Sequence, residues 1–230
     1  MSAARTARER VREELTRRIK EEARRQLAVE GAQRLSLRAV ARELGMVSSA
    51  IYRYFPSRDD LLTSLIIDAY GALGDQLEKV ATAPGEPGPR ERWRALCAAV
   101  RDWARAHPHQ YALVYGTPVP GYVAPQATIE PAVRVFEALA WAVKEAPAGD
   151  DTARGRALPD ELARQFTGVG LLVAPGVAPA VVGRAAIVWM QLFGMVSFEL
   201  FGHLAGALEP ADGFFAYAVE EMADYLGLEA

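Results

Sequence analysis

Two hydroxyl groups, a phenol and a guanidinium recur at helical spacing within residues 48–55. At about 100° per residue they share one arc, and that arc consists of Ser48, Ser49, Tyr52 and Arg53. The other arc is apolar and is expected to pack inward: Val47, Ile51, Tyr54 and Phe55. A helix that is narrow at its start and rich in hydrogen-bonding groups on its free face suits the major groove of DNA. This stretch therefore indicates base- and phosphate-contacting chemistry.

A shorter helical pattern precedes this stretch and is expected to position it. Its apolar side is made by Leu37, Val40, Ala41 and Leu44. Gly45 then ends the helix, because only glycine enters a left-handed turn without steric cost. Two short helices joined by a glycine turn predict a helix-turn-helix.

A third helix is predicted to begin directly after Pro56. Ser57 and Asp60 match a capping box, with Ser57 as the N-cap and Asp60 three residues later. An apolar pattern at helical spacing follows: Leu61, Leu62, Leu65 and Ile66. This helix should fix the orientation of the stretch before it.

These residues resemble the DNA-binding domain of the tetracycline-repressor (TetR) family over roughly residues 12–70. The resemblance rests on the following residues: Gly31, Ser36-Leu37-Arg38, Val40-Ala41, the run Gly45–Phe55, Arg58 and Leu61-Leu62. One position departs from the family, which usually has Ser or Thr where Val47 stands. The recognition helix is then either capped one residue later, by Ser48, or uncapped.

The resemblance implies a set of DNA contacts. Tyr52 and Arg58 are expected to hold phosphates. The bases or the nearby backbone are expected to meet Ser48, Ser49 and Arg53. On the preceding helix, Ser36 can offer its hydroxyl and its backbone N–H to a phosphate, and Arg38 lies on the exposed arc. The alternative is that these are ordinary surface residues.

The formal net charge of −3 is unevenly divided along the 230 residues. Residues 1–60 hold 14 Lys+Arg and 9 Asp+Glu, a charge of +5, whereas residues 61–230 hold 12 and 20, a charge of −8. This asymmetry indicates a basic N-terminal part that binds a polyanion, joined to an acidic C-terminal part that does not bind it.

The whole chain reads as all-α, a TetR-like arrangement with about nine to ten helices. We expect an N-terminal DNA-binding domain of three helices over residues 1–57, with its motif at about 36–55. Residues 58–230 are expected to form a C-terminal helical bundle for ligand binding and dimerisation. The hydrophobic fraction of 51% is sufficient for a sizeable core,.

The last two predicted helices, 181–204 and 211–226, indicate a homodimer. The first is apolar on every face, and one short chain is unlikely to cover all of it. The predicted interface is Val182, Ala185, Trp189, Phe193, Val196, Phe214 and Met222. The alternative is a central helix in a large monomer. This region also resembles a TetR subgroup with a Trp-x-x-x-His-Gly sequence, with Phe193 in place of the histidine.

Aromatic side chains from several segments of the body suggest a pocket for an apolar or aromatic inducer. The candidates are Trp93, Trp103, Tyr111, Tyr115, Phe136, Trp141 and Phe166. The alternative is that they belong to the hydrophobic core and line no pocket, as aromatic residues at helical spacing usually do. Proline-rich loops beside them favour a lined cavity.

Other classes of site are not supported by the sequence. His107, His109 and His203 lack the neighbouring ligands of a metal site, and no catalytic constellation or cofactor motif is present. The single cysteine, Cys97, is expected to be a buried core residue. A chain with one cysteine also fits a reducing cytoplasm. The uncharged run 166–183 contains Pro175 and Pro179, which argue against a membrane span.

The sequence thus predicts a cytoplasmic, homodimeric TetR-type regulator that binds double-stranded operator DNA. Its expected behaviour is that of a repressor released by a small apolar ligand, with no enzymatic activity. Two alternatives stay open: a helix-turn-helix protein without an inducer, and a helical carrier or enzyme with a vestigial DNA-binding domain.

Overall fold

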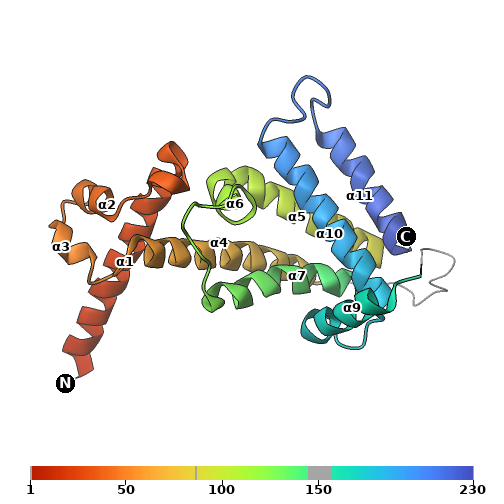
Figure 1. The fold of residues 1–230 in the computed structure, drawn as a ribbon, viewed down its shortest axis with the longest axis horizontal. Coiled ribbons are helices and arrows are strands. Elements are labelled where there is room, and N and C mark those ends of the chain that lie inside the picture. The colour runs from red at the N-terminus through yellow and green to blue at the C-terminus, as the bar shows by residue number, and fades with distance from the viewer. Residues whose placement is uncertain (1, 86, 145–156, 230) are drawn as a thin grey trace. The chain divides into compact units, whose positions relative to one another are not determined.

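All regular structure in the described part of the chain is helical, which confirms the predicted all-α fold. The structure, a computed structural model, describes residues 2–85, 87–144 and 157–229, with the backbone alone for residues 2–6 and 139–144. Its helices (Figure 1) are α1 (Ser2–Glu30), η1 (Ala32–Arg34), α2 (Leu37–Glu43), α3 (Ser48–Ile51), α4 (Arg58–Ala81), α5 (Pro89–Ala106), α6 (Pro108–Tyr115), η2 (Gln126–Thr128), α7 (Ile129–Lys144), α9 (Asp160–Val173), α10 (Pro179–Leu200) and α11 (Asp212–Leu226).

The chain divides into two compact units. One consists of Met1–Ala69 with His109–Thr128, and the other of Tyr70–Pro108 with Ile129–Ala230. Helix α4 runs without interruption from the first unit into the second. The boundary predicted between residues 57 and 58 stays a prediction, because contact grouping alone does not define where a DNA-binding domain ends.

The first unit has a core shared by α1, α2, α3 and the start of α4. Its completely buried side chains include Ile19, Val40, Ile51 and Leu61, one from each helix. On α1 only the later apolar residues are buried, since Ile19, Ala23 and Leu27 are at most 5% exposed and Val11 is 60% exposed. Ser57 caps α4 as predicted, since its hydroxyl accepts from the Asp60 N–H at 3.1 Å. The Asp60 carboxylate accepts from the same hydroxyl at 2.7 Å.

The core of the second unit lies where α5, α10 and α11 meet. Helix α10 packs against α5, α7, α9 and α11, and it lies alongside α11 in Figure 1. Trp93 of α5 is buried and donates from its indole N–H to the Val219 carbonyl of α11, 3.0 Å away. Arg101 makes a two-pronged ion pair with Glu199, with both N···O distances 2.7 Å, which ties α5 to α10.

Candidate DNA-binding surface

Both ends of α2 are fixed by local hydrogen bonds. The Ser36 hydroxyl is the N-cap and accepts from the Ala39 N–H at 3.4 Å,. At the other end Gly45 has φ +65°. The Met46 N–H bonds the Ala41 carbonyl at 2.8 Å and the Gly45 N–H bonds the Arg42 carbonyl at 3.1 Å. These two bonds form the glycine C-cap expected of a left-handed residue.

Helix α3 is shorter than the sequence predicted. Its α-helical part is Ser48–Ile51, and residues 52–54 continue as a tight turn in which the Tyr54 N–H bonds the Ile51 carbonyl at 2.9 Å. The α-helical part ends before the predicted Phe55, although the Phe55 N–H still bonds the Ile51 carbonyl at 3.0 Å. Pro56, directly after it, has no N–H with which to continue the helix. Of the two capping alternatives, the structure has the uncapped one: Val47 is the N-cap, with no side-chain hydrogen bond.

The polar arc of this segment faces outward. Ser48, Ser49 and Arg53 are exposed, and Tyr52 is 42% exposed. Ile51 and Phe55 are buried, as the apolar arc predicted. The expectation that Val47 packs inward was wrong, since its side chain is 72% exposed. As the N-cap residue, Val47 precedes the helix and need not follow its angular spacing.

Arg58 has a structural role that sequence reasoning missed. Its Nε donates to the Leu35 carbonyl at 3.1 Å, and its Nη2 donates to the Ala32 carbonyl at 2.9 Å and the Gln33 carbonyl at 3.3 Å. The guanidinium thus joins the start of α4 to the chain between α1 and α2. Its predicted contact with a phosphate stays untested, and these bonds already use several of its donors.

Helix α1 holds the other parts of the unit in place. Arg12 donates to the Arg53 carbonyl at 3.3 Å and lies 5.6 Å from the centre of the Tyr54 ring,. Lys20 and Arg24 both pair with Asp68 of α4, at 2.9 Å and 2.5 Å. The spacing of these two cations, four residues apart on one helical face, was the signal in the sequence that could have indicated a shared carboxylate.

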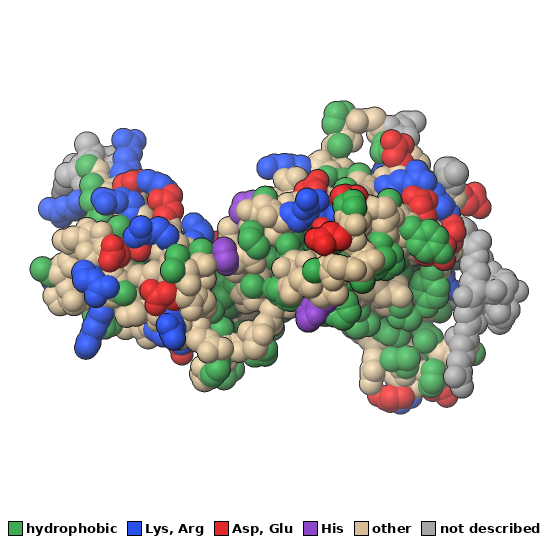
Figure 2. Space-filling view, turned by 90° about the horizontal axis from the view of Figure 1, so that it is seen from above, with side chains coloured by type: hydrophobic (Ala, Val, Ile, Leu, Met, Phe, Trp, Pro, Cys, Tyr) green, Lys and Arg blue, Asp and Glu red, His purple; other side chains and the backbone are tan. Residues whose placement is uncertain are grey.

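The surface around α2 and α3 is basic. Arg38 and Arg53 extend from it into solvent, and Figure 2 shows Lys and Arg side chains gathered over the left part of the visible face. Within the described part of the chain, neither of these two arginines pairs with a carboxylate. Their charge is therefore available to a polyanion.

The seven aromatic candidates for an inducer pocket occupy several separate places. Tyr111 and Tyr115 belong to the first unit, with ring centres 5.1 Å apart. In the second unit Trp103 neighbours His107, Phe136 neighbours Trp189, and Phe166 lies against Gly183. Trp93 is core, and the side chain of Trp141 lies outside the described residues.

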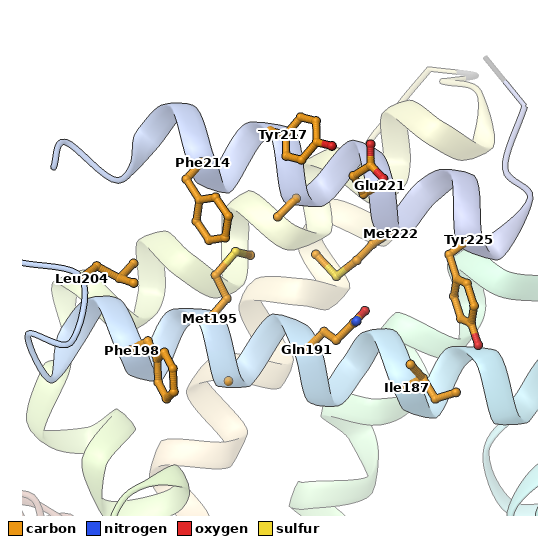
Figure 3. A pocket seen from close by; sticks show the side chains of 12 residues that line it. Ile187, Gln191, Met195, Phe198, Leu204, Phe214, Tyr217, Glu221, Met222 and Tyr225 are labelled. Carbon is orange, nitrogen blue, oxygen red and sulfur yellow. The ribbon is translucent and has the colours of Figure 1, made fainter. Parts of the chain in front are cut away.

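An apolar groove of about 730 Å³ lies between α10 and α11, and none of those seven residues lines it. Figure 3 shows Met195 and Phe214 pointing toward one another across it, with Met222 beside them. Polar groups are few: Gln191, Tyr217, Glu221 and Tyr225. A hydrogen bond to the Glu221 carboxylate raises the pKa of Tyr217.

Most residues of the predicted dimer interface are already covered within one chain. Five of the seven are at most 7% exposed: Val182, Ala185, Phe193, Val196 and Met222. Trp189 is half-buried and Phe214 is 39% exposed. The apolar side chains that α10 and α11 leave open are instead Ile187, Met190, Phe198, Phe214, Tyr217 and Tyr225.

Other predicted roles can be placed in the described residues. No group of three or more metal-ligating side chains occurs there. A ring nitrogen of His107, the C-cap of α5, lies 3.0 Å from the Trp103 carbonyl. Cys97 is completely buried, which raises the pKa of its thiol.

Among the helices that the structure describes, α10 alone is long and apolar enough to cross a membrane. Half of its apolar stretch is buried, however, and the core helices of other proteins meet the same criterion.

Two protein families match this chain. Residues 19–65 match the bacterial regulatory proteins of the tetR family, and residues 93–222 match the tetracyclin repressor-like C-terminal domain. The helix-turn-helix and the start of α4 lie inside the first match, and the groove between α10 and α11 lies mostly inside the second.

Similar proteins have been described from several sources. The chain is 39% identical over 173 residues to the HTH-type transcriptional regulator Rv1816 of Mycobacterium tuberculosis, covering 73% of each chain. The crystal structure of the protein SCO4313 is similar at 30% identity and TM-score 0.79, covering 94% of this chain and 98% of that one. BioQ with its double-stranded DNA operator shares the fold at 20% identity and TM-score 0.50, covering 92% and 97%.

Proposed function

Because this chain belongs to the TetR family of bacterial regulatory proteins and is a DNA-binding transcriptional regulator, we propose that it is a repressor. It holds operator DNA as a homodimer and releases it when a small apolar ligand binds the C-terminal body. The Trp-x-x-x-His-Gly subgroup, with Phe193 in place of histidine, is part of this proposal, and so is a cytoplasmic location.

The outward face of α3 carries this proposal. Ser48, Ser49 and Arg53 are exposed, as is Arg38 of the neighbouring helix α2, and neither arginine has a carboxylate partner in the described residues. Hydroxyl and guanidinium donors contact phosphates, and arginine also reads guanine in the major groove. Ser36 is half-buried and both of its groups are already engaged: its hydroxyl caps α2, and its backbone N–H donates to the side-chain oxygen of Gln26 at 3.5 Å.

Electrophoretic mobility shift with salt titration tests the DNA-binding part. The probe is the duplex upstream of the protein's own gene, with a random duplex of equal length as competitor. A repressor should bind the first much more tightly, with an affinity that falls as salt rises because phosphate contacts release counterions. Equal affinity for both duplexes at every salt concentration would contradict an operator-specific function.

The groove between α10 and α11 supports the proposal of a homodimer. Ile187, Phe198 and Tyr217, which line it, are 42%, 56% and 62% exposed, which is unusual for large apolar side chains grouped on two adjacent helices. A second copy applied through a two-fold axis would cover both grooves and complete a four-helix bundle. The residues we propose for this interface are those left open in one chain: Ile187, Met190, Phe198, Phe214, Tyr217 and Tyr225.

Two buried indole groups support the proposal that the C-terminal body binds a ligand. The N–H groups of Trp103 and Trp189 have no hydrogen-bond partner among the described residues, and an unsatisfied buried donor costs about 1–3 kcal/mol. Both side chains lie among aromatic neighbours. A mostly apolar molecule that carries a hydrogen-bond acceptor would suit either position.

A thermal-shift screen of apolar and aromatic metabolites tests the inducer. A true ligand raises the melting temperature by mass action and lowers operator affinity in the same concentration range. The Trp103→Phe and Trp189→Phe variants should reduce the response to a ligand that bonds that indole. A ligand that stabilises the protein without releasing DNA would contradict an inducer role.

The release mechanism follows from α4. This helix belongs to both units, so a shift of its second half moves its first half as well. In a dimer, such a shift would change the separation of the two α3 segments, which must fit successive major grooves about 34–36 Å apart. Ligand binding would then favour the arrangement that does not fit.

A further inference from the structure

Val47 is an exposed apolar side chain at the start of the recognition element. It has φ −65° and ψ 136°, directly before Ser48–Ile51, and 72% of its surface is open to solvent. Ile51 and Phe55, which follow it in the same segment, are buried. The side chain of Val47 therefore does not serve the core of the unit.

Valine at this position also leaves α3 without a side-chain cap. A serine, threonine or aspartate would accept a hydrogen bond from the first free N–H groups of the helix, which valine cannot do. The other helix of the motif uses such a cap, since Ser36 accepts from the Ala39 N–H. The choice of valine thus reduces the local stability of α3 and gains no burial within the chain.

We propose that Val47 reads the 5-methyl group of a thymine in the operator. Thymine presents that methyl in the major groove, where it distinguishes T·A from the other base pairs through apolar contact. The N-terminal residues of a recognition helix are the ones that reach base edges. Val47 offers two methyl groups there, beside the exposed hydroxyls of Ser48 and Ser49. This inference rests on the DNA-binding function and adds a base preference to it.

Replacing thymine by deoxyuridine tests the contact, because uracil differs from thymine only by lacking the methyl group. Duplexes are first selected from a random library with the wild-type protein. Each thymine of the selected site is then replaced singly, and dissociation constants are measured for the wild type, Val47→Ser and Val47→Thr. Val29→Ser is the matched control, since Val29 is 81% exposed on α1.

The wild type should lose about fourfold in affinity at one thymine per half-site, the value of one buried methyl-sized group. Val47→Ser should bind the thymine and the deoxyuridine duplexes equally well at that position. Val47→Thr retains one methyl group and should keep most of the preference, and Val29→Ser should behave as the wild type. Serine can cap α3, so circular dichroism should show Val47→Ser folded.

Three results would overturn the proposal: selected sites without a common thymine, no position sensitive to deoxyuridine, or the same sensitivity in Val47→Ser as in the wild type. In each of these cases the protein still binds selected DNA, and its function as a regulator stands. If the library yields no bound duplex at all, sequence-specific DNA binding fails together with the thymine contact.

Discussion

The Nε of Arg58 donates to the backbone carbonyl oxygen of Leu35, which lies 3.1 Å away and directly precedes the N-cap of α2. Two further bonds, from Nη2 to the carbonyls of Ala32 and Gln33, secure the same segment. The first residue of α4 thereby sets the position at which α2 begins.

Arg58→Ala should lower the free energy of unfolding by about 1–3 kcal/mol, because it removes the donors of part-buried carbonyl groups. Arg58→Lys should recover only a fraction, since an ammonium group cannot span three carbonyls as the guanidinium fork does. Urea denaturation followed by circular dichroism measures both. Arg34→Ala, at an exposed arginine of the same segment, is the control. If Arg58 served DNA alone, stability would stay unchanged and only the salt dependence of binding would fall.

Arg53→Ala should weaken binding to the specific operator by about 1–3 kcal/mol if its guanidinium reads guanine. Binding to a random duplex should change much less, and mobility shift on both duplexes shows the difference. An equal loss on every sequence would identify Arg53 as a phosphate contact instead.

Phe198→Asp should dissociate the proposed dimer. A charge placed in an apolar interface removes an aromatic contact and leaves the carboxylate unpaired, which corresponds to about 2 kcal/mol or more, roughly 30-fold in the dimer dissociation constant. Sedimentation velocity over a concentration series measures the change. Val123→Asp, at a valine that is 86% exposed in the first unit, should leave the oligomeric state as it is. A monomeric wild type would contradict the interface.

Glu220 should make stability depend on pH in the acid range. Hydrogen bonds from Arg94 and then Arg90 lower the pKa of its carboxyl to about 2, against 4.5 for a free glutamate. The folded state therefore binds this proton less readily than the unfolded state, so the contribution is complete above pH 4.5 and is lost as the pH falls toward 2. Glu220→Gln should lower the melting temperature at pH 7, with a smaller difference at pH 3. A difference that is constant with pH would exclude the ion pairs as its cause.

Gly183→Ala should destabilise the second unit by about 1–3 kcal/mol through overpacking. A Cβ at Gly183 would lie 2.9 Å from Cε2 of Phe166, where α9 and α10 approach closely. Phe166→Leu in the same chain should recover part of the loss, as a double-mutant cycle in urea would show. Gly168→Ala on α9 meets nothing within 4 Å and should be neutral or slightly stabilising.

Local signals predicted the motif well. The serine cap of α4 and the left-handed Gly45 act within four residues, so the sequence contains all of their geometry. Ser36, for which only a phosphate contact was predicted, caps α2 through a bond of the same local kind. Val47 was placed wrongly because helical spacing was applied to a residue that precedes the helix. The sequence contained a sign of this, since Val47 stands where the TetR family usually has Ser or Thr, the residue types that cap helices.

Features that depend on distant packing could not be predicted. The sequence of α10 is apolar on most faces, and periodicity cannot show that Val182 and Val196 are buried while Met190 and Phe198 stay open. The same holds for the aromatic candidates, of which Trp93 turned out to bond α11. The bonds from Arg58 to residues 32–35 cross more than 20 positions of the chain, and no local pattern indicated them.

The attachment of α4 has a consequence for genetics. Arg58 holds the start of this helix and Asp68, paired with Lys20 and Arg24, holds it three turns later. Between these two anchors the helix has no freedom to turn independently of α1 and α2. If the protein is the inducible repressor proposed above, codons 70–81, which include Gly71 and Gly74, are therefore where a selection for super-repressor alleles, which bind inducer but keep silencing their promoter, should find most of its α4 mutations.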